Sequence, residues 1–217
     1  MKTTSVKRPV IKGLYAITPD ETDTAELLRK VSLALKGGVQ VLQYRNKSAD
    51  AALKLQQAQA LRQHTREFGT TFIVNDDVHL ATKVAADGVH LGGEDGSVAA
   101  ARALLGKAGI IGVSCYNRAP LALEAARQGA DYVAFGAFFP SSVKPGAVKA
   151  DVQLLRSVRP ELNVPIVAIG GITVQNGATL IEAGADVLAV ITALWDAADI
   201  EQAARDFSNL FRQGRTA

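Results

Sequence analysis

Several short polar segments of this 217-residue chain carry side chains suited to binding phosphate or a divalent metal ion. One of them is Gln43-Tyr44-Arg45-Asn46-Lys47, which follows an apolar run. Because side chains alternate along a strand, Gln43, Arg45 and Lys47 are expected to point the same way. An arginine and a lysine in such a place indicate a phosphate-bearing ligand, and a solvated charge run is the alternative interpretation.

Carboxylates follow two later apolar runs, and they are the candidate metal ligands. Asn75-Asp76-Asp77 ends one run, and Asp95 comes shortly after another. Mg²⁺ prefers one or two carboxylates together with water and substrate phosphates, so Asp76 and Asp95 are predicted to share one Mg²⁺ ion. Asp77 precedes a predicted helix and is expected to be its N-cap, which is also the alternative role for Asp95.

A serine and a lysine add to this predicted diphosphate site. Ser114 ends a further apolar run and is a candidate hydrogen-bond donor to a ligand. Lys144 lies in the longest irregular loop, residues 138–146, which carries hydroxyl groups and is expected to act as a lid. Lys144 is the group of this loop that we expect to reach an anion.

A second and simpler phosphate site is predicted near the C-terminal end of the chain. Gly171 belongs to a glycine pair after one apolar run, and Ile191-Thr192 ends the next. Glycine lets the backbone approach a ligand closely, and backbone N–H groups at such positions often bind phosphate. With no evident nucleophile or general base, the two sites together favour a reaction driven by the departure of diphosphate.

The elements that must position these residues alternate between apolar strands and Ala/Leu-rich helices along the whole chain. This alternation predicts an α/β protein with a parallel sheet, namely a single (βα)8 TIM barrel, and a doubly wound open sheet is the alternative. The strands are predicted at residues 14–18, 39–44, 71–74, 88–91, 110–114, 131–137, 165–169 and 186–191. The helices are predicted at residues 24–36, 49–68, 78–85, 97–105, 119–128, 150–158, 174–183 and 200–211.

In a barrel the active site forms at the carboxyl ends of the strands, where all the candidate residues above are found. Asp87, Asp131 and Asp186 lie instead in the turns that enter strands, so we expect them to be structural. We predict one domain over residues 1–217, with residues 1–12 as a flexible or peripheral segment.

Composition excludes several classes of protein. The net charge is +3 and 48% of the residues are hydrophobic, as in an ordinary globular protein. Cys115 is the single cysteine, so an internal disulfide is excluded. We expect Cys115 to be a small buried residue. No secretory signal, transmembrane run or basic cluster with aromatics is present, so we expect a cytoplasmic location and neither membrane nor nucleic-acid partners. The sequence leaves the oligomeric state open.

The histidines are few and are not assigned to catalysis. The chain has three histidines and one cysteine, and with so few of these zinc ligands a zinc site is not expected. His90 lies within a predicted strand, and we expect it to be a hydrogen-bonded interior group.

From residue 13 to about residue 194, the chain resembles the thiamine-phosphate synthase family. The resemblance rests on several motifs in order, of which the first two are specific on their own. They are Gln43-Tyr44-Arg45-Asn46-Lys47, Val74-Asn75-Asp76-Asp77, Gly88-Val89-His90-Leu91-Gly92 with Glu94-Asp95, Phe138-Phe139-Pro140 with Lys144-Pro145, and Ala168-Ile169-Gly170-Gly171-Ile172.

The resemblance implies a transferase that joins hydroxymethylpyrimidine diphosphate to hydroxyethylthiazole phosphate, giving thiamine monophosphate and pyrophosphate. It implies a dissociative mechanism assisted by Mg²⁺, with Arg45, Lys47, Ser114 and Lys144 as the catalytic residues. The implied pyrimidine diphosphate site is Gln43, Tyr44, Arg45, Asn46, Lys47, Asn75, Ser114 and Lys144. The implied metal ligands are Asp76 and Asp95, and the implied thiazole phosphate site is Ser141, Ser142, Val143, Gly171, Ile191 and Thr192.

Two residues depart from the family pattern, and three alternative functions stay open. Val143 stands where the family loop usually has a threonine, and Gly93 stands where it often has glutamine. The alternatives are a thiazole tautomerase of the same fold, a non-catalytic barrel that binds thiamine precursors, and an unrelated phosphate-binding barrel such as a sugar-phosphate epimerase or an indole-ring enzyme. Whether the thiazole substrate carries a carboxylate also stays open.

Overall fold

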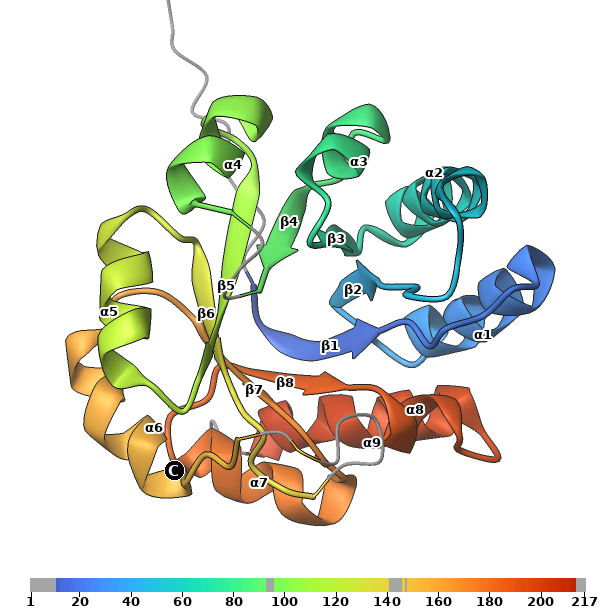
Figure 1. Cartoon of the computed structure of the whole chain (residues 1–217). Coiled ribbons are helices and arrows are strands. Elements are labelled where there is room, and N and C mark those ends of the chain that lie inside the picture. The colour runs from blue at the N-terminus through green and yellow to red at the C-terminus, as the bar shows by residue number, and fades with distance from the viewer. Residues whose placement is uncertain (1–10, 93–95, 141–145, 147, 214–217) are drawn as a thin grey trace, which may run out of the picture.

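The structure is a computed structural model, and it describes residues 11–92, 96–140, 146 and 148–213. Eight parallel strands close into a barrel in chain order, with β8 paired to β1. Helices surround the barrel, as Figure 1 shows. The predicted TIM barrel is therefore confirmed, and the open sheet is excluded. The strands are β1 (Gly13–Ile17), β2 (Val41–Tyr44), β3 (Thr71–Asn75), β4 (Gly88–Leu91), β5 (Ile110–Tyr116), β6 (Tyr132–Phe135), β7 (Ile166–Ile169) and β8 (Val187–Val190).

The helices follow the strands in the predicted alternation. Asp77 caps α3 by accepting a hydrogen bond from Leu80 N at 2.8 Å, as expected. The N-cap of α4 is Ser97, so the alternative of Asp95 as this cap is wrong. The helices are α1 (Thr24–Lys36), α2 (Ala51–Phe68), α3 (Val78–Lys83), α4 (Val98–Leu105), α5 (Ala119–Arg127), α6 (Val152–Val158), α7 (Val174–Glu182), α8 (Thr192–Trp195) and α9 (Ile200–Gln213), with a 3-10 turn at Arg159–Glu161.

The strands are short and apolar because both of their faces are buried. In β1, Leu14 and Ala16 belong to the layer between the sheet and the helices, whereas Tyr15 and Ile17 belong to the barrel interior. The same alternation divides the other strands, so side chains two apart share a face. This parity decides which residues at the strand ends point into the barrel.

The turns that enter three strands are fixed by aspartates paired with arginines. The carboxylate of Asp87 accepts two hydrogen bonds from Arg62, each of 2.8 Å, and a third from Phe72 N at the start of β3. The same arrangement joins Asp131 to Arg102 and Ile111 N, and Asp186 to Arg159 and Ile166 N. The structural role expected for these three aspartates is confirmed.

Several element bounds differ from the sequence prediction by one or two residues, and one helix is additional. The helix α8 was not predicted, because four residues are too few to show a helical period; it is anchored by Trp195, whose indole N–H donates to Ile17 O at 2.6 Å. Strand β6 ends at Phe135 rather than residue 137: Gly136 N still donates to Tyr116 O of β5, but Ala137 N donates to Val148 O, outside the sheet.

The expectation for the single cysteine is also met. Cys115 is buried, and this burial raises the pKa of its thiol to about 12, which makes it a packing residue rather than a nucleophile. No helix in the described ranges is long and apolar enough to cross a bilayer. Of the predicted N-terminal segment 1–12, the structure describes only Ile11 and Lys12.

Candidate active site

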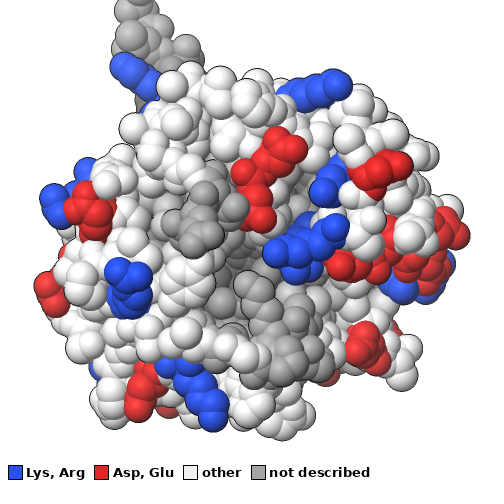
Figure 2. All heavy atoms as spheres, viewed as in Figure 1, with Lys and Arg blue, Asp and Glu red and all other residues white. Residues whose placement is uncertain are grey.

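A cavity of about 920 Å³ opens at the carboxyl ends of the strands. Figure 2 shows a hollow on the molecular face turned to the viewer, with basic and acidic side chains close to its edge. A volume of this size is at the upper end of ordinary ligand pockets and has room for two small substrates. Every strand contributes to the lining: Tyr15, Gln43, Asn75, His90, Ser114, Ala134, Val167 and Ala189 come from β1 to β8 in order.

The carboxyl end of β2 brings Gln43 and Arg45 into the cavity, as alternation along the strand predicted. The backbone there is tied to the end of β1, because Thr18 Oγ1 accepts from Arg45 N and donates to Arg45 O, both at 2.9 Å. Asp20 Oδ1 lies 3.4 Å from Arg45 Nη1 and accepts from Lys47 N at 3.0 Å. The guanidinium is thereby held at the rim of the cavity.

The other members of this segment do not line the cavity. Tyr44 is buried in the layer between strands and helices, where its hydroxyl donates to Gln57 Oε1 at 2.9 Å. Asn46 is buried on the same side, and its amide donates to Glu21 O at 2.7 Å and to Gln57 Oε1 at 3.1 Å. The structure therefore places both side chains outside the cavity lining, although the family resemblance implies that they touch the pyrimidine diphosphate. Lys47 is exposed outside the cavity lining.

Asn75 and Asp76 lie at the carboxyl end of β3. Asn75 lines the cavity, whereas Asp76 is half-buried next to it. The backbone of Asp76 is left-handed, with φ 61°, and its N–H donates to His90 O at 2.8 Å. A left-handed backbone at a residue other than glycine is strained, and aspartate is among the residues that tolerate it best. This backbone aims the Asp76 side chain differently from a regular strand residue.

A hydrogen-bonded group of side chains lies in the barrel interior at the bottom of the cavity, where Tyr15 and His90 belong to the lining and Tyr132 does not. The hydroxyls of Tyr15 and Tyr132 lie 2.9 Å apart, and Gln43 Nε2 donates to Tyr15 at 2.8 Å. His90 joins Tyr132 to Ser114, with its ring nitrogens 2.9 Å from each hydroxyl oxygen. The expected interior role of His90 is confirmed. Burial raises the pKa of both Tyr15 and Tyr132 well above the usual range, so both are neutral.

Gly171 shapes the opposite side of the cavity. Its φ is +60°, and a Cβ added there would lie 2.2 Å from Pro140 O. Phe139 N donates to Gly170 O at 3.0 Å, which fixes the two loops against each other. Asn176 holds this loop from α7, since its amide donates to Gly171 O at 3.1 Å and accepts from Thr173 N at 2.8 Å.

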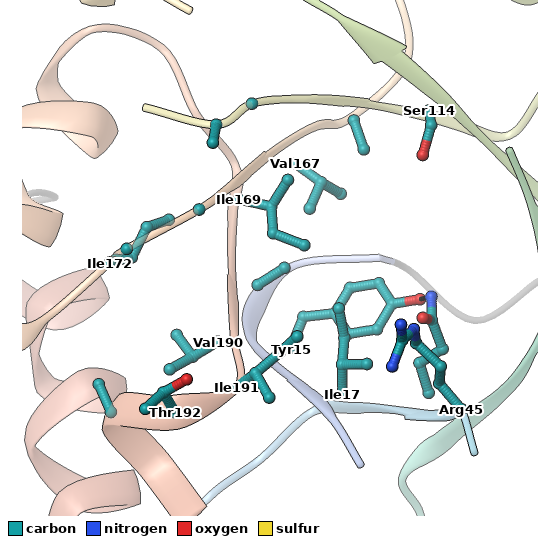
Figure 3. A pocket seen from close by; sticks show the side chains of 18 of the residues that line it. Tyr15, Ile17, Arg45, Ser114, Val167, Ile169, Ile172, Val190, Ile191 and Thr192 are labelled. Atoms are coloured by element: carbon teal, nitrogen blue, oxygen red, sulfur yellow. Dashed lines mark hydrogen bonds between the residues drawn. The ribbon is translucent and has the colours of Figure 1, made fainter. Parts of the chain in front are cut away.

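Ile191 and Thr192 line the cavity beside this loop, at the start of α8. Figure 3 shows them on one side of the cavity and Arg45 on another, with Tyr15 and Ile17 between. The two groups of anion-binding candidates therefore share one cavity and approach it from different sides.

Five of the predicted site residues lie outside the described residues: Asp95, Ser141, Ser142, Val143 and Lys144. Their assigned roles stay predictions.

Sequence reasoning missed several polar residues in and around the site, Tyr116 and Thr173 of the lining among them. Tyr15, Asp20 and Tyr132 were not singled out, although Tyr15 shares the inward parity of Ile17 and Tyr132 that of Ala134. Their inward-facing positions in short strands were the signal from which the two tyrosines could have been predicted. Asp20 offered no such signal, because only the folded loops bring it to Arg45.

Comparisons with known proteins agree with this geometry. A family model described as "Thiamine monophosphate synthase" matches residues 14–194. The chain is 59% identical to thiamine-phosphate synthase of Methylobacillus flagellatus over 203 residues, which cover 94% of this chain and 97% of the relative. It is 56% identical to thiamine-phosphate synthase of Azoarcus sp. over 201 residues, which cover 93% and 98%.

Among solved structures, the fold is similar to thiamine phosphate pyrophosphorylase from Pyrococcus furiosus, with a TM-score of 0.84 and 35% identity. That match covers 93% of this chain and 96% of the other. Sequence, fold and cavity thus agree, and the chain belongs to the thiamine-phosphate synthase family.

Proposed function

We propose that this chain, acting as a single domain, condenses 4-amino-2-methyl-5-hydroxymethylpyrimidine diphosphate with 4-methyl-5-(2-hydroxyethyl)thiazole phosphate, or its carboxylated form. The products are thiamine monophosphate and pyrophosphate. The observation that carries the proposal is one cavity of about 920 Å³ approached from different sides by Arg45 and by the Gly171, Ile191 and Thr192 backbone. Two phosphorylated substrates fit such an arrangement better than one.

The diphosphate is proposed to bind at the β2 side. Arg45 presents a guanidinium whose side chain is 19% exposed, so its charge is partly shielded from water and acts strongly on an anion. Lys47 and Lys144 are proposed to add positive charge to the same group. The thiazole phosphate is proposed to bind to backbone N–H groups near Gly171 and Thr192, and Ser141, Ser142 and Val143 stay predicted contacts to it.

The donor set fits a magnesium ion better than a transition metal. No three His, Cys, Asp or Glu side chains within the described ranges gather as a metal cluster. Mg²⁺ needs only one or two carboxylates when substrate phosphates complete its shell, and Asp76 at the end of β3 meets that need. We propose Asp76 and Asp95 as the ligands. When bound, Mg²⁺ would supply charge neutralisation on the departing diphosphate.

The proposed reaction is a dissociative substitution. The bond between the pyrimidine methylene carbon and the diphosphate oxygen breaks, and its electron pair leaves with the diphosphate toward Arg45, Lys47 and Lys144. The electron-rich aminopyrimidine carries the resulting cation until the thiazole nitrogen lone pair forms the new carbon–nitrogen bond. Ile17, Val167 and Ile169 line the cavity with apolar surface, which keeps water away from the cation.

A turnover assay tests the proposal. Purified protein is incubated with both substrates, with Mg²⁺ or with EDTA, and thiamine monophosphate is measured. We expect product that forms with Mg²⁺ and not with EDTA. Folded protein that binds the pyrimidine diphosphate without turnover would contradict the proposal and favour a binding protein, and isomerisation of the thiazole alone would favour a tautomerase.

A further inference from the structure

A continuous chain of hydrogen bonds crosses the barrel interior, and its middle member touches no part of the cavity. Gln43 Nε2 bonds to the Tyr15 hydroxyl at 2.8 Å, and Tyr15 bonds to the Tyr132 hydroxyl at 2.9 Å. Tyr132 then bonds to His90 Nδ1 at 2.9 Å, and His90 Nε2 bonds to Ser114 Oγ at 2.9 Å. Five strands contribute one side chain each.

The direction of every bond follows from the first one. Gln43 Nε2 can only donate, so the Tyr15 oxygen accepts and its own proton goes to Tyr132. Tyr132 passes its proton to His90 Nδ1, which therefore carries none. The neutral imidazole then bears its proton on Nε2 and donates it to Ser114 Oγ. Ser114 keeps its hydroxyl proton for a partner in the cavity.

The reverse direction is unfavourable because both tyrosines are buried. Tyr15 is 1% exposed and Tyr132 is 0% exposed. With the bonds reversed, the Tyr15 oxygen would receive protons from both Gln43 and Tyr132. Its own proton would then have no acceptor among the residues that the structure describes, and leaving a buried donor unpaired destabilises the fold.

We propose that Tyr132 is a positioning residue that fixes the His90 tautomer, so that the cavity presents a proton donor at Ser114 and an acceptor at Gln43 Oε1. Tyr132 is absent from the cavity lining, so it acts through its neighbours. The donor at Ser114 and the acceptor at Gln43 are complementary to a heteroaromatic ring that carries a ring-nitrogen acceptor and a neighbouring amine donor. This last step rests on the proposed function, whose aminopyrimidine has both groups.

The first test reads the tautomer without any substrate. Protein labelled with ¹⁵N-histidine is studied by NMR at mildly alkaline pH, and the His90 signal is assigned with His90→Gln. We expect the Nε2–H tautomer in the wild type and a shift toward Nδ1–H in Tyr132→Phe, which has no proton to offer Nδ1. Tyr44→Phe is the matched control, since it removes a buried hydroxyl outside the barrel interior and is expected to leave the His90 tautomer unchanged.

The second test separates positioning from stability. Tyr132→Phe is expected to raise KM for the pyrimidine diphosphate about tenfold, the worth of one or two hydrogen bonds, and to leave KM for the thiazole phosphate unchanged. An Nδ1–H tautomer in the wild type, which needs no variant to fold, would overturn the proposal. So would folded Tyr132→Phe with either an unchanged tautomer or an unchanged pyrimidine KM. If the wild type forms no thiamine monophosphate, the proposed function fails while the tautomer still decides this inference.

Discussion

The guanidinium of Arg45 lies 3.4 Å from the carboxylate of Asp20, and the same carboxylate oxygen accepts a hydrogen bond from Lys47 N at 3.0 Å. Asp20 comes from the loop after β1, whereas Arg45 and Lys47 follow β2. One carboxylate thus fixes the segment that carries both cations. It is a positioning residue for the proposed diphosphate site.

Removing this carboxylate is expected to weaken diphosphate binding. Asp20→Ala loses the acceptor for Lys47 N, so the segment moves and KM for the pyrimidine diphosphate rises about fivefold. Asp20→Asn keeps an oxygen for that bond and is expected to have a smaller effect. Steady-state kinetics with each substrate varied in turn measure both. Equal KM values in Asp20→Ala and the wild type would show that the segment is held by other contacts.

Substitutions of the neighbouring aspartates Asp76 and Asp77, after β3, are expected to affect turnover and stability respectively. Asp76→Asn removes the proposed metal ligand while keeping a residue that tolerates φ 61°, so kcat/KM is expected to fall about 100-fold with little change in Tm. Asp77→Ala removes the α3 cap and is expected to lose about 1 kcal/mol of unfolding free energy with turnover retained. Full activity in Asp76→Asn would refute the metal assignment.

The substitution Gly171→Ala is expected to disturb the proposed thiazole phosphate site. Its Cβ would lie 2.2 Å from Pro140 O, so the loop must shift, and KM for the thiazole phosphate is expected to rise about tenfold. Gly129→Ala is the matched control: that glycine also has a positive φ, +91°, but nothing lies within 4 Å of an added Cβ. The control is expected to lose about 1 kcal/mol of stability with KM unchanged. Equal KM changes in both variants would contradict a local effect.

Stability is expected to fall at alkaline pH because neutral tyrosines are buried, among them Tyr15 and Tyr132. Burial raises the folded-state pKa of Tyr15 and Tyr132 above the ordinary value of 10.0. Below pH 10 both states are protonated, whereas above it only the unfolded chain releases these protons. Each tyrosine then lowers the unfolding free energy by about 1.4 kcal/mol per pH unit until its folded-state pKa is reached.

Urea unfolding at a series of pH values measures this slope. Tyr15→Phe removes one of these groups, so its slope above pH 10 is expected to be shallower than that of the wild type by about 1.4 kcal/mol per pH unit. Comparison with the wild type cancels the ionisation of lysines, which is common to both. Parallel curves would mean that Tyr15 ionises as easily in the folded as in the unfolded protein.

The sequence by itself determined the barrel, the end of it that carries the site, and most of the polar groups there. Strand and helix periods are local properties of the chain, and the site of a parallel barrel lies at the carboxyl ends of its strands. Hence Gln43, Arg45, Ser114, Gly171, Ile191 and Thr192 were predicted from neighbouring residues alone, and Asn75 from the family resemblance. The structure brings all of them into one cavity.

Only the tertiary structure decided which side chains face that cavity and what connects them. Tyr44 and Asn46 belong to a matching motif, yet strand parity turns them toward the helices. Tyr15 and Tyr132 are 117 residues apart, and their 2.9 Å contact exists only because barrel closure brings the interiors of β1 and β6 together. Contacts of this kind depend on how non-adjacent strands meet, which no local pattern of residues specifies.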